Sequence, residues 1–453
     1  MEKDKDFLGT EPIGKLLLRL AIPTLAAQLI NMLYNVVDRI YIGHIPKVGA
    51  LALTGVGVCM PLIMIVSAFA VLVGNGGAPR ASIYMGQNNK EDAEKTLGNC
   101  FATQILVAIV LTIVLLLGNR TFLLAFGASE NTISYAAAYM NIYAVGTIFV
   151  QLTLGLNAFI TAQGFAKTGM LSVLIGAVIN IVLDPIFIFG LHMGVRGAAL
   201  ATIISQACSC IWVVSFLFGK KTFLKIQRKN MKLEARIILP SLALGLATFI
   251  MQASESIITV CFNSSLLKYG GDIAVGAMTI LTSVMQFAML PLQGLGQGAQ
   301  PILSYNYGAK NVDRVRGTFR LLLKVSVGYA VILWLCVDFS TDFVSMFTSD
   351  AALLAFGKTA LRVYMAAMFM FGSRSHARWD LPSLGCAPES IIVAVMRKFV
   401  LLIPLIYIVP HIWSADRTMG VYLAEPIADF FAVTFTMILF SNRFKKALKK
   451  IEK

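Results

Sequence analysis

Long apolar runs recur along almost the whole of this 453-residue chain, separated by short charged or glycine-rich breaks. A helix crosses the hydrocarbon core of a bilayer with about 20 predominantly apolar residues, because every backbone polar group must be satisfied within the segment. Only 13% of the residues are charged and 57% are hydrophobic, which excludes a string of water-soluble domains. The runs therefore predict an all-α polytopic membrane protein.

The breaks divide the chain into about twelve predicted transmembrane helices. These cover residues 16–42, 51–84, 98–118, 135–162, 169–190, 197–218, 237–264, 273–306, 319–342, 357–383, 389–410 and 419–441. The first helix is expected to be retained, because it is longer than the core of a signal peptide and lacks a small-residue cleavage site.

Basic residues are concentrated in the breaks. Seven Lys or Arg lie in residues 219–236 and six in residues 442–453. Because cytoplasmic loops carry an excess of Lys and Arg, both segments and both chain termini are predicted to be cytoplasmic. The formal net charge of +15 is therefore interpreted as a topology signal and not as a nucleic-acid-binding surface.

The two halves of the chain repeat each other. "GNGGAPRASIYMGQNN" and "GQGAQPILSYNYGAKN" share glycine, proline, serine, glycine and asparagine at the same spacing, each pair 222 positions apart. The pairs are Gly76 with Gly298, Pro79 with Pro301, Ser82 with Ser304, Gly86 with Gly308 and Asn89 with Asn311. Each half also opens with a helix in which a proline precedes a carboxylate by fifteen residues, Pro23 before Asp38 and Pro240 before Glu255. This pattern indicates a duplication.

An even number of helices in each half keeps the halves in the same orientation, so a pseudo-twofold axis should run along the membrane normal. We expect an N-terminal six-helix lobe at 1–218 and a cytoplasmic basic linker at 219–236. A C-terminal six-helix lobe with a basic cytoplasmic tail should occupy 237–453.

The clearest carboxylates within predicted membrane helices are Asp38, Asp184 and Glu255. Burying such a group in hydrocarbon costs at least about 2.5 kcal/mol, so these side chains should face a bundle interior or a water-filled cavity. Asn180 lies one helical turn before Asp184. Such oxygens could accept a proton, replace the hydration shell of Na⁺, or only hydrogen-bond neighbouring helices.

Other kinds of site leave no pattern in the sequence. There is no phosphate-binding loop, zinc motif or nucleophile elbow, so an enzyme is not expected. The seven cysteines have no ligand spacing, and Cys208 and Cys210 point to different faces of one helix, so neither a metal nor a disulfide framework is predicted. No cofactor is expected, and energy for active transport would come from an ion gradient.

Several motifs spread over the chain together resemble one transporter family. They are "VVDRIYIG", "GNGGAP", "INIVLDP", "GVRGAALAT" and "GVYLAEPIAD". In these the chain resembles the multidrug and toxic compound extrusion (MATE) family, and within it the MepA-like bacterial branch. The resemblance implies a secondary active exporter of cationic or amphipathic compounds, driven by H⁺ or Na⁺ antiport through alternating access.

The resemblance also implies site residues. A cation-coupling site would use Asp38, Asn157, Asn180, Asp184, Thr202 and Glu255, and Pro23 is the candidate gating position. Glu425 lies five residues after Gly420, as Thr202 lies five after Gly197, and so matches Thr202 in the second half. Its role is either functional or that of a structural carboxylate at a helix end.

Residues 373–383 depart from the family, which has a continuous apolar tenth helix where this chain has Ser-Arg-Ser-His-Ala-Arg-Trp-Asp. A functional insertion of charge, a re-entrant or loop region, and a local frame error in the gene are the three interpretations, and we favour the third. A shifted back-translation of residues 372–379 reads Ile-Gln-Ile-Ala-Cys-Gln-Met, which suits a membrane helix. The family's pattern resumes at "LGCAPES".

Alternatives to multidrug efflux are a lipid-linked precursor flippase, a transport-impaired variant caused by residues 373–383, and a non-transporting receptor or scaffold. A flippase typically has cationic residues lining a central cavity, whereas the interior charges here are interpreted as mainly acidic. The expected partners are cationic or amphipathic small molecules and the lipid bilayer, without nucleic acid. The protein is expected to act as a monomer in the bacterial inner membrane.

Overall fold

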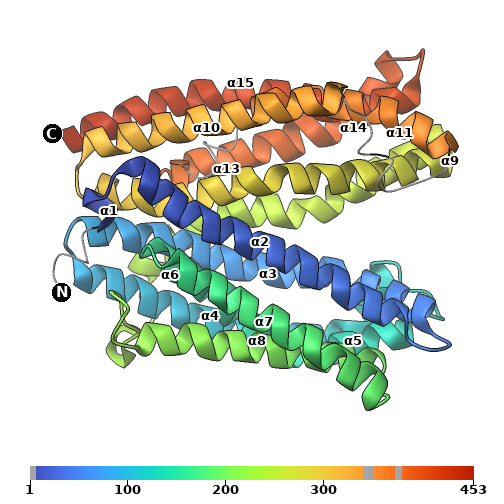
Figure 1. The fold of residues 1–453 in the computed structure, drawn as a ribbon, viewed down its shortest axis with the longest axis horizontal. Coiled ribbons are helices and arrows are strands. Elements are labelled where there is room, and N and C mark those ends of the chain that lie inside the picture. The colour runs from blue at the N-terminus through green and yellow to red at the C-terminus, as the bar shows by residue number, and fades with distance from the viewer. Residues whose placement is uncertain (1–6, 340–343, 345–350, 373–379, 453) are drawn as a thin grey trace.

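The structure is a computed structural model, which describes residues 7–339, 344, 351–372 and 380–452. Throughout these residues the regular secondary structure is helical, and the helices form two bundles (Figure 1). The first bundle contains α1 (Phe7–Thr10), α2 (Ile13–Gly43), α3 (Gly49–Gly86), α4 (Lys90–Ala125), α5 (Ile133–Val145), α6 (Thr147–Ala162), α7 (Ala166–Pro185), η1 (Ile186–Gly190) and α8 (Val195–Phe218). The short helix η2 (Arg228–Asn230) lies between the bundles in sequence.

The second bundle contains the rest of the described chain. Its helices are α9 (Ala235–Gly308), α10 (Val312–Phe339), α11 (Ala351–Tyr364), η4 (Met368–Met370), α13 (Ala387–Val395), η5 (Met396–Leu402), α14 (Ile403–Ile412) and α15 (Arg417–Glu452). α9 is two helices that meet at Gly271, whose φ of +63° is readily adopted only by glycine. The break turns the chain between two membrane-length segments, residues 235–271 and 273–308.

Ten of the described helical segments are long and apolar enough to cross a membrane. An eleventh forms if α5 and α6, which meet at a bend of 58°, count as one. Eleven of the twelve predicted positions are thus accounted for. At the twelfth, predicted over 357–383, α11 ends at Tyr364, and residues 373–379 lie outside the described part of the chain. The prediction of an all-α polytopic membrane protein with two lobes is confirmed.

The outer surfaces of the bundles carry large apolar side chains. On α2 and α4, Leu33 is 63% exposed and Leu117 is 85% exposed. Similar residues run along the same helices, among them Leu18, Ile22, Leu106 and Ile113. A continuous exposed apolar surface of this kind is stable only against lipid, so it is the lipid-facing surface of the protein.

Glycines bring the two lobes into contact. A Cβ atom at Gly86 of α3 would overlap the carbonyl oxygen of Tyr305 in α9, and one at Gly308 would overlap that of Ile83. These contacts are reciprocal, because both pairs, Gly86 with Gly308 and Ile83 with Tyr305, are 222 positions apart. The repeated glycines therefore meet across the pseudo-twofold axis, where only hydrogen side chains allow the helices to cross this closely.

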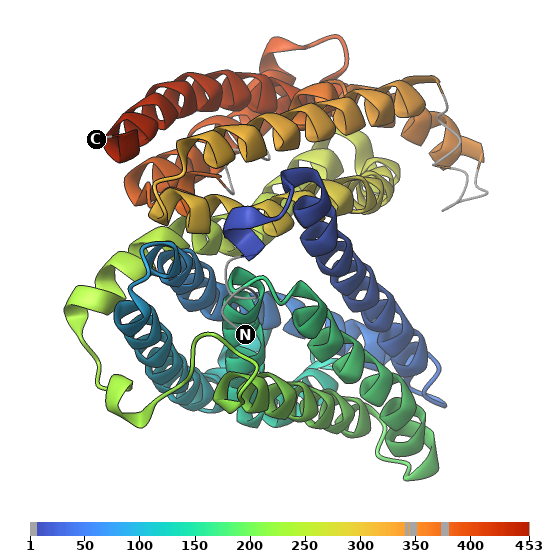
Figure 2. The same ribbon diagram turned by 60° about the vertical axis from the view of Figure 1, so that its left-hand side comes forward.

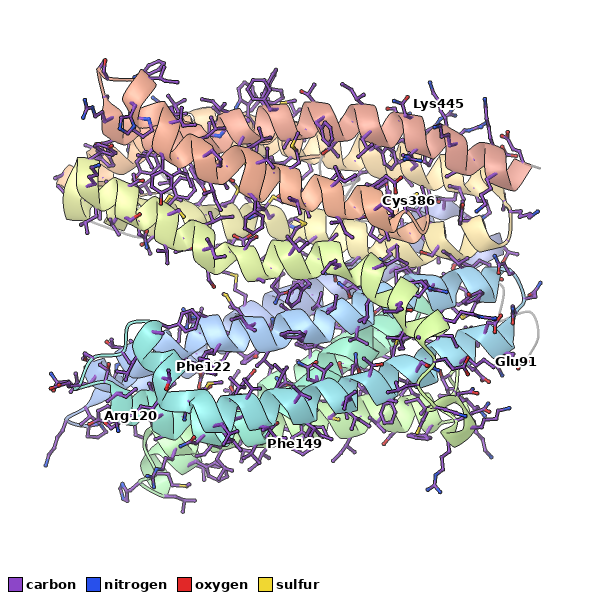
Figure 3. All side chains as sticks on the ribbon, turned by 180° about the vertical axis from the view of Figure 1, so that it is seen from behind. Glu91, Arg120, Phe122, Phe149, Cys386 and Lys445 are labelled. Atoms are coloured by element: carbon purple, nitrogen blue, oxygen red, sulfur yellow. The ribbon has the colours of Figure 1, made fainter. Side chains whose placement is uncertain are left out.

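One end of the lobe interface is closed and the other is open. Figure 3 shows the bundles in contact at the end that carries Glu91 and Lys445 and separated at the end that carries Arg120 and Phe122. A cavity of about 770 Å³ lies between them, lined on one side by Met60 and Met64 of α3 and on the other by α9 and η5 residues. The protein therefore has a V shape with its cavity open on the side away from both termini.

A buried carboxylate lies directly after residues 373–379. Asp380 is 1% exposed, and neither of its carboxylate oxygens has a hydrogen-bond partner in the described structure. Burial of a charge without a partner is strongly unfavourable. The frame-error interpretation of residues 373–383 stays a prediction, because residues 373–379 lie outside the described part of the chain.

On the frame-error interpretation, replacing residues 373–379 by Ile-Gln-Ile-Ala-Cys-Gln-Met should increase the amount of folded protein in the membrane and the rate of transport per cell. The physical reason is removal of Arg374 and Arg378 from a predicted membrane helix, where each costs about 2.5–3.5 kcal/mol. Size-exclusion profiles of the two proteins and dye efflux from cells would measure this. Equal yields and equal efflux would contradict the frame-error interpretation.

Candidate functional site

Two carboxylates meet inside the first bundle. Asp38, near the end of α2, is 7% exposed, and Asp184, near the end of α7, is fully buried. Their carboxyl groups lie within hydrogen-bonding reach of each other. Asn180 is one turn before Asp184 on α7, and its amide nitrogen donates to Asp184 Oδ1 at 3.3 Å. Three of the predicted site residues are therefore brought together.

This cluster has more acceptors than donors. Asp38 Oδ1, Asn180 Oδ1 and Asp184 Oδ2 are all buried and have no hydrogen-bond donor in the described structure. Two ionised carboxylates in contact repel each other strongly when water is excluded. The group becomes favourable when a cation lies between the oxygens, either a proton shared by the pair or a metal cation.

Tyrosines and a threonine surround the carboxylates. Tyr34, one turn before Asp38 on α2, and Tyr139 on α5 are both close enough to Asp38 to interact with its charge. Tyr139 is also near Thr202 on α8. The Thr202 hydroxyl donates to the Ala198 carbonyl at 3.0 Å. The predicted Thr202 therefore lies at the edge of the cluster, and its hydroxyl hydrogen-bonds to its own helix.

Asn157 does not join this cluster. Its amide nitrogen donates to the Gly169 carbonyl at 3.4 Å, and its Oδ1 has no partner in the described structure. Gly169 lies on α7 eleven residues before Asn180, a distance of about 16 Å along a helix axis. An ion bound between Asp38 and Asp184 would therefore not touch Asn157 in this conformation.

Pro23 lies inside α2, which continues through it as a helix. The next residue, Thr24, donates to the Gly294 carbonyl of α9 at 3.0 Å. Figure 2 shows α2, in dark blue, extending from the first bundle to the second. α2 therefore carries Asp38 near one end and is hydrogen-bonded to the second lobe beside Pro23, towards its other end.

Glu255 is in a different cluster, in the second lobe. Its carboxylate pairs with Lys398 of η5 at 2.6 Å, and the Lys398 side chain is 4% exposed. The neighbouring Arg397 donates to Asp429 at 2.7 Å and to Glu425 at 2.5 Å, both on α15. Two adjacent cations therefore hold three carboxylates in one charge network, in which Glu425 is bound by Arg397 and only Glu255 is exposed.

Arg397, Lys398 and Asp429 were not among the predicted site residues. The second lobe contains these two buried cations beside its carboxylates, so its interior charges are not acidic alone. The signal was available, because "MRKFVLL" places two adjacent basic residues inside a predicted membrane helix. The π-helical turn of η5 accommodates them with both head groups facing carboxylates.

Replacing Arg397 by Met should destabilise the protein by about 3–5 kcal/mol, because Glu425 and Asp429 would lose the cation that compensates their buried charge. Thermal unfolding in detergent would show this as a large fall in Tm. Lys15→Met is a suitable control, because Lys15 is 75% exposed in its pair with Glu11 and its loss should change Tm little. A Tm of Arg397→Met close to that of the control would contradict this account of the network.

The charge network forms part of the wall of the 770 Å³ cavity. Glu255, Lys398, Arg397 and Glu425 all line it, together with Tyr364 and Phe371. Methionines line it from both lobes: Met60, Met64, Met251, Met285 and Met289. Flexible thioether side chains fit ligands of varied shape, and aromatic faces attract cations. The cavity is therefore suited to bulky apolar molecules that carry a positive charge.

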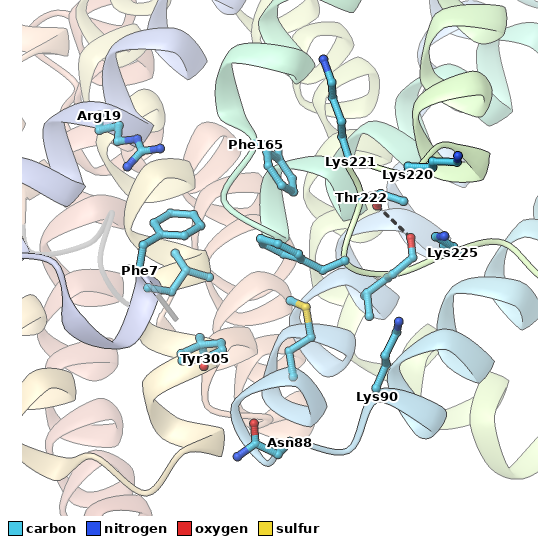
Figure 4. A pocket seen from close by; sticks show the side chains of 14 residues that line it. Phe7, Arg19, Asn88, Lys90, Phe165, Lys220, Lys221, Thr222, Lys225 and Tyr305 are labelled. Atoms are coloured by element: carbon cyan, nitrogen blue, oxygen red, sulfur yellow. Dashed lines mark hydrogen bonds between the residues drawn. The ribbon is translucent and has the colours of Figure 1, made fainter. Parts of the chain in front are cut away.

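A second cavity, of about 780 Å³, lies at the closed end. Figure 4 shows Phe7, Arg19, Phe165, Lys221 and Tyr305 around it. Thr222 beside them donates to the Leu224 carbonyl at 2.8 Å. Lys221, which lines this cavity, belongs to the segment 219–236, which is predicted from the charge distribution to be cytoplasmic.

The MatE family model matches residues 23–186 and 246–408. The chain belongs to the MATE family. The two matched segments end 222 positions apart, the spacing of the internal repeat, so each half carries one copy of the family unit. Proteins of this family are membrane transporters and not enzymes, so the chain is a transporter.

Curated relatives support the assignment over nearly the full length. Multidrug export protein MepA of Staphylococcus haemolyticus is 24% identical over 436 residues, covering 95% of this chain and 94% of the relative. MepA of Staphylococcus aureus is 22% identical, covering 96% of this chain and 95% of the relative.

Solved structures share the fold of this MATE protein. A MATE crystal structure in the bent conformation superposes with a TM-score of 0.92 at 22% identity, covering 100% of this chain and 99% of the other. An outward-facing multidrug resistance MATE transporter superposes with a TM-score of 0.90 at 23% identity, with the same coverage. Both similarities establish the fold.

Proposed function

We propose that this MATE protein exports cationic, amphipathic drug-like compounds in exchange for H⁺ or Na⁺. The pair Asp38 and Asp184 supports the proposal. These two buried carboxylates lie close to each other, and the acceptor oxygens around them outnumber the hydrogen-bond donors. Such a pair is most favourable when it holds a cation. The names of the curated relatives, which are multidrug export proteins, support the substrate class.

The connections of α2 suggest how loading drives transport. α2 contacts α7 through Asp38 and contacts α9 of the other lobe through Thr24. A proton or Na⁺ at the carboxylates removes their repulsion and changes how the two helices pack. α2 then transmits the change to the lobe interface, with Pro23 as the flexible point because proline removes a backbone hydrogen bond.

The proposed setting is the bacterial inner membrane, with the protein acting as a monomer, both termini and the 219–236 linker in the cytoplasm. In that orientation the 770 Å³ cavity opens to the outside, and the glycine contacts at Gly86 and Gly308 close the cytoplasmic side. The conformation described here is then the one that releases drug and loads the coupling ion. Lobes 1–218 and 237–453 would be the moving units.

Transport by the purified protein in vesicles tests the proposal. A pH gradient or a Na⁺ gradient is imposed separately, and movement of the cationic dye ethidium is followed by fluorescence. We expect dye to move against its own gradient under at least one of the two ions, and an ionophore that dissipates that gradient should stop it. Dye movement that is the same with and without either gradient would contradict antiport.

The buried cations Arg397 and Lys398 favour one competing function, a flippase for lipid-linked anions. Both cations are already paired with carboxylates, however. A flippase also needs free positive charge in its cavity to bind phosphate. The same vesicles with a fluorescent phospholipid in place of dye separate the two functions.

A further inference from the structure

The Glu255–Lys398 pair joins an exposed carboxylate to a buried cation. The Glu255 side chain is 55% exposed and lines the 770 Å³ cavity, whereas the Lys398 side chain is 4% exposed. The carboxylate therefore faces the cavity and the ammonium group approaches it from inside the protein.

The neighbouring pairs are closed in comparison. Arg397 is 8% exposed and contacts both Glu425 and Asp429, which are 8% and 1% exposed. Arginine holds two carboxylates in a fixed geometry, whereas lysine is a single charge on a flexible four-carbon chain. Lys398 can therefore leave its partner more easily than Arg397 can, and Glu425 lines the same cavity as Lys398.

We propose that Glu255 binds the positive group of a transported drug, and that Lys398 is an internal competitor which occupies Glu255 when no drug is present. This inference rests on the proposed export of cationic compounds. A drug would insert its apolar part among Met251, Met285 and Met289 and bring its charge to the exposed face of Glu255. Lys398 would then shift towards Glu425, so that no buried charge is left alone.

The competition has a consequence for selectivity. A cationic ligand at Glu255 replaces the positive charge of Lys398 by another positive charge, so the carboxylate stays compensated. A neutral ligand gains nothing at Glu255 and does not displace Lys398. Lys398 therefore weakens the binding of singly charged cationic drugs enough for them to dissociate, and it leaves the affinity for neutral compounds unchanged.

Binding of ethidium to the purified protein in detergent, measured by fluorescence anisotropy without any ion gradient, tests this inference separately from transport. Lys398→Gln should tighten ethidium binding by roughly tenfold, and Glu255→Gln should weaken it by a similar factor. In the double variant the Lys398→Gln substitution should have no further effect, because it acts only through Glu255. The uncharged dye Nile red should bind all of these proteins alike.

Arg443→Gln is the matched control. Arg443 pairs with Glu389 at 2.8 Å in the same lobe, and neither residue lines the cavity. Its loss should leave ethidium binding unchanged. Glu255→Gln removes the partner of a buried lysine, so thermal unfolding is measured for every variant. The direction of the change in ethidium affinity is judged from Lys398→Gln alone, because the exposed Glu255 stays hydrated in that variant. Weaker or unchanged ethidium binding by Lys398→Gln, or the same tightening without Glu255, would overturn the inference.

Discussion

Asp38→Asn is expected to abolish ion-coupled dye export while leaving the amount of folded protein in the membrane unchanged. The amide has nearly the shape of the carboxylate, but it cannot share a proton with Asp184 or contribute charge to a bound Na⁺. Its nitrogen can instead donate to the unpartnered Asp184 oxygen, so the site is stabilised without a coupling ion.

The size of this effect distinguishes a coupling role from a structural one. We expect export to fall by more than about a hundredfold with Tm equal to or above that of the unmodified protein, since an unfavourable pair of acceptors has been removed. Asp313→Asn is the control, because Asp313 begins α10 outside both clusters. Drug resistance at the level of the unmodified protein in cells that produce Asp38→Asn would contradict the proposed function.

The second large effect is expected at the lobe interface. Gly86→Ala or Gly308→Ala places a methyl group where the opposite helix has a backbone carbonyl, so the helices have to move apart. Backbone atoms cannot rotate away as a side chain can, and overpacking of this kind costs about 1–3 kcal/mol or more. We expect a lower Tm and loss of most transport, because the closed end of the V no longer seals.

Gly328→Ala provides the matched comparison for these glycine variants. Gly328 lies within α10, and a Cβ atom there would contact nothing. Alanine favours a helix over glycine by about 0.8–1 kcal/mol, so this variant should be as stable as the unmodified protein or slightly more so. If Gly86→Ala matched Gly328→Ala in both Tm and transport, the proposed crossing of α3 and α9 would be contradicted.

Much of the fold could be predicted because a bilayer imposes one rule on every spanning segment. The predicted helix 273–306 is found at 273–308, and 197–218 is found at 195–218. The bend of 58° between α5 and α6 was not predicted, because Gly146 lies in an uninterrupted apolar run. The repeated glycines indicated duplication, but their contact across the axis depends on how two distant helices cross.

The candidate site was predictable to the extent that intramembrane carboxylates are costly. That cost pointed to Asp38 and Asp184, and the structure brings them together from α2 and α7. It could not tell that Glu255 has a lysine partner, because the pairing joins residues 143 positions apart. The sequence also could not show that Asn157 hydrogen-bonds to Gly169 and not to the carboxylates, since an amide side chain in a helical bundle has several possible partners.

In the proposed exchange, binding of drug in the 770 Å³ cavity favours release of the coupling ion from Asp38 and Asp184 through α2. Counting the ions released on drug binding tests this coupling. Purified protein is titrated with ethidium in weakly buffered solution, with a pH indicator for H⁺ and a selective electrode for Na⁺. Because linkage between two ligands is reciprocal, we predict release of about one H⁺ or one Na⁺ for each dye bound, and none from Asp38→Asn. Full dye binding with no release of either ion from the unmodified protein would contradict the account.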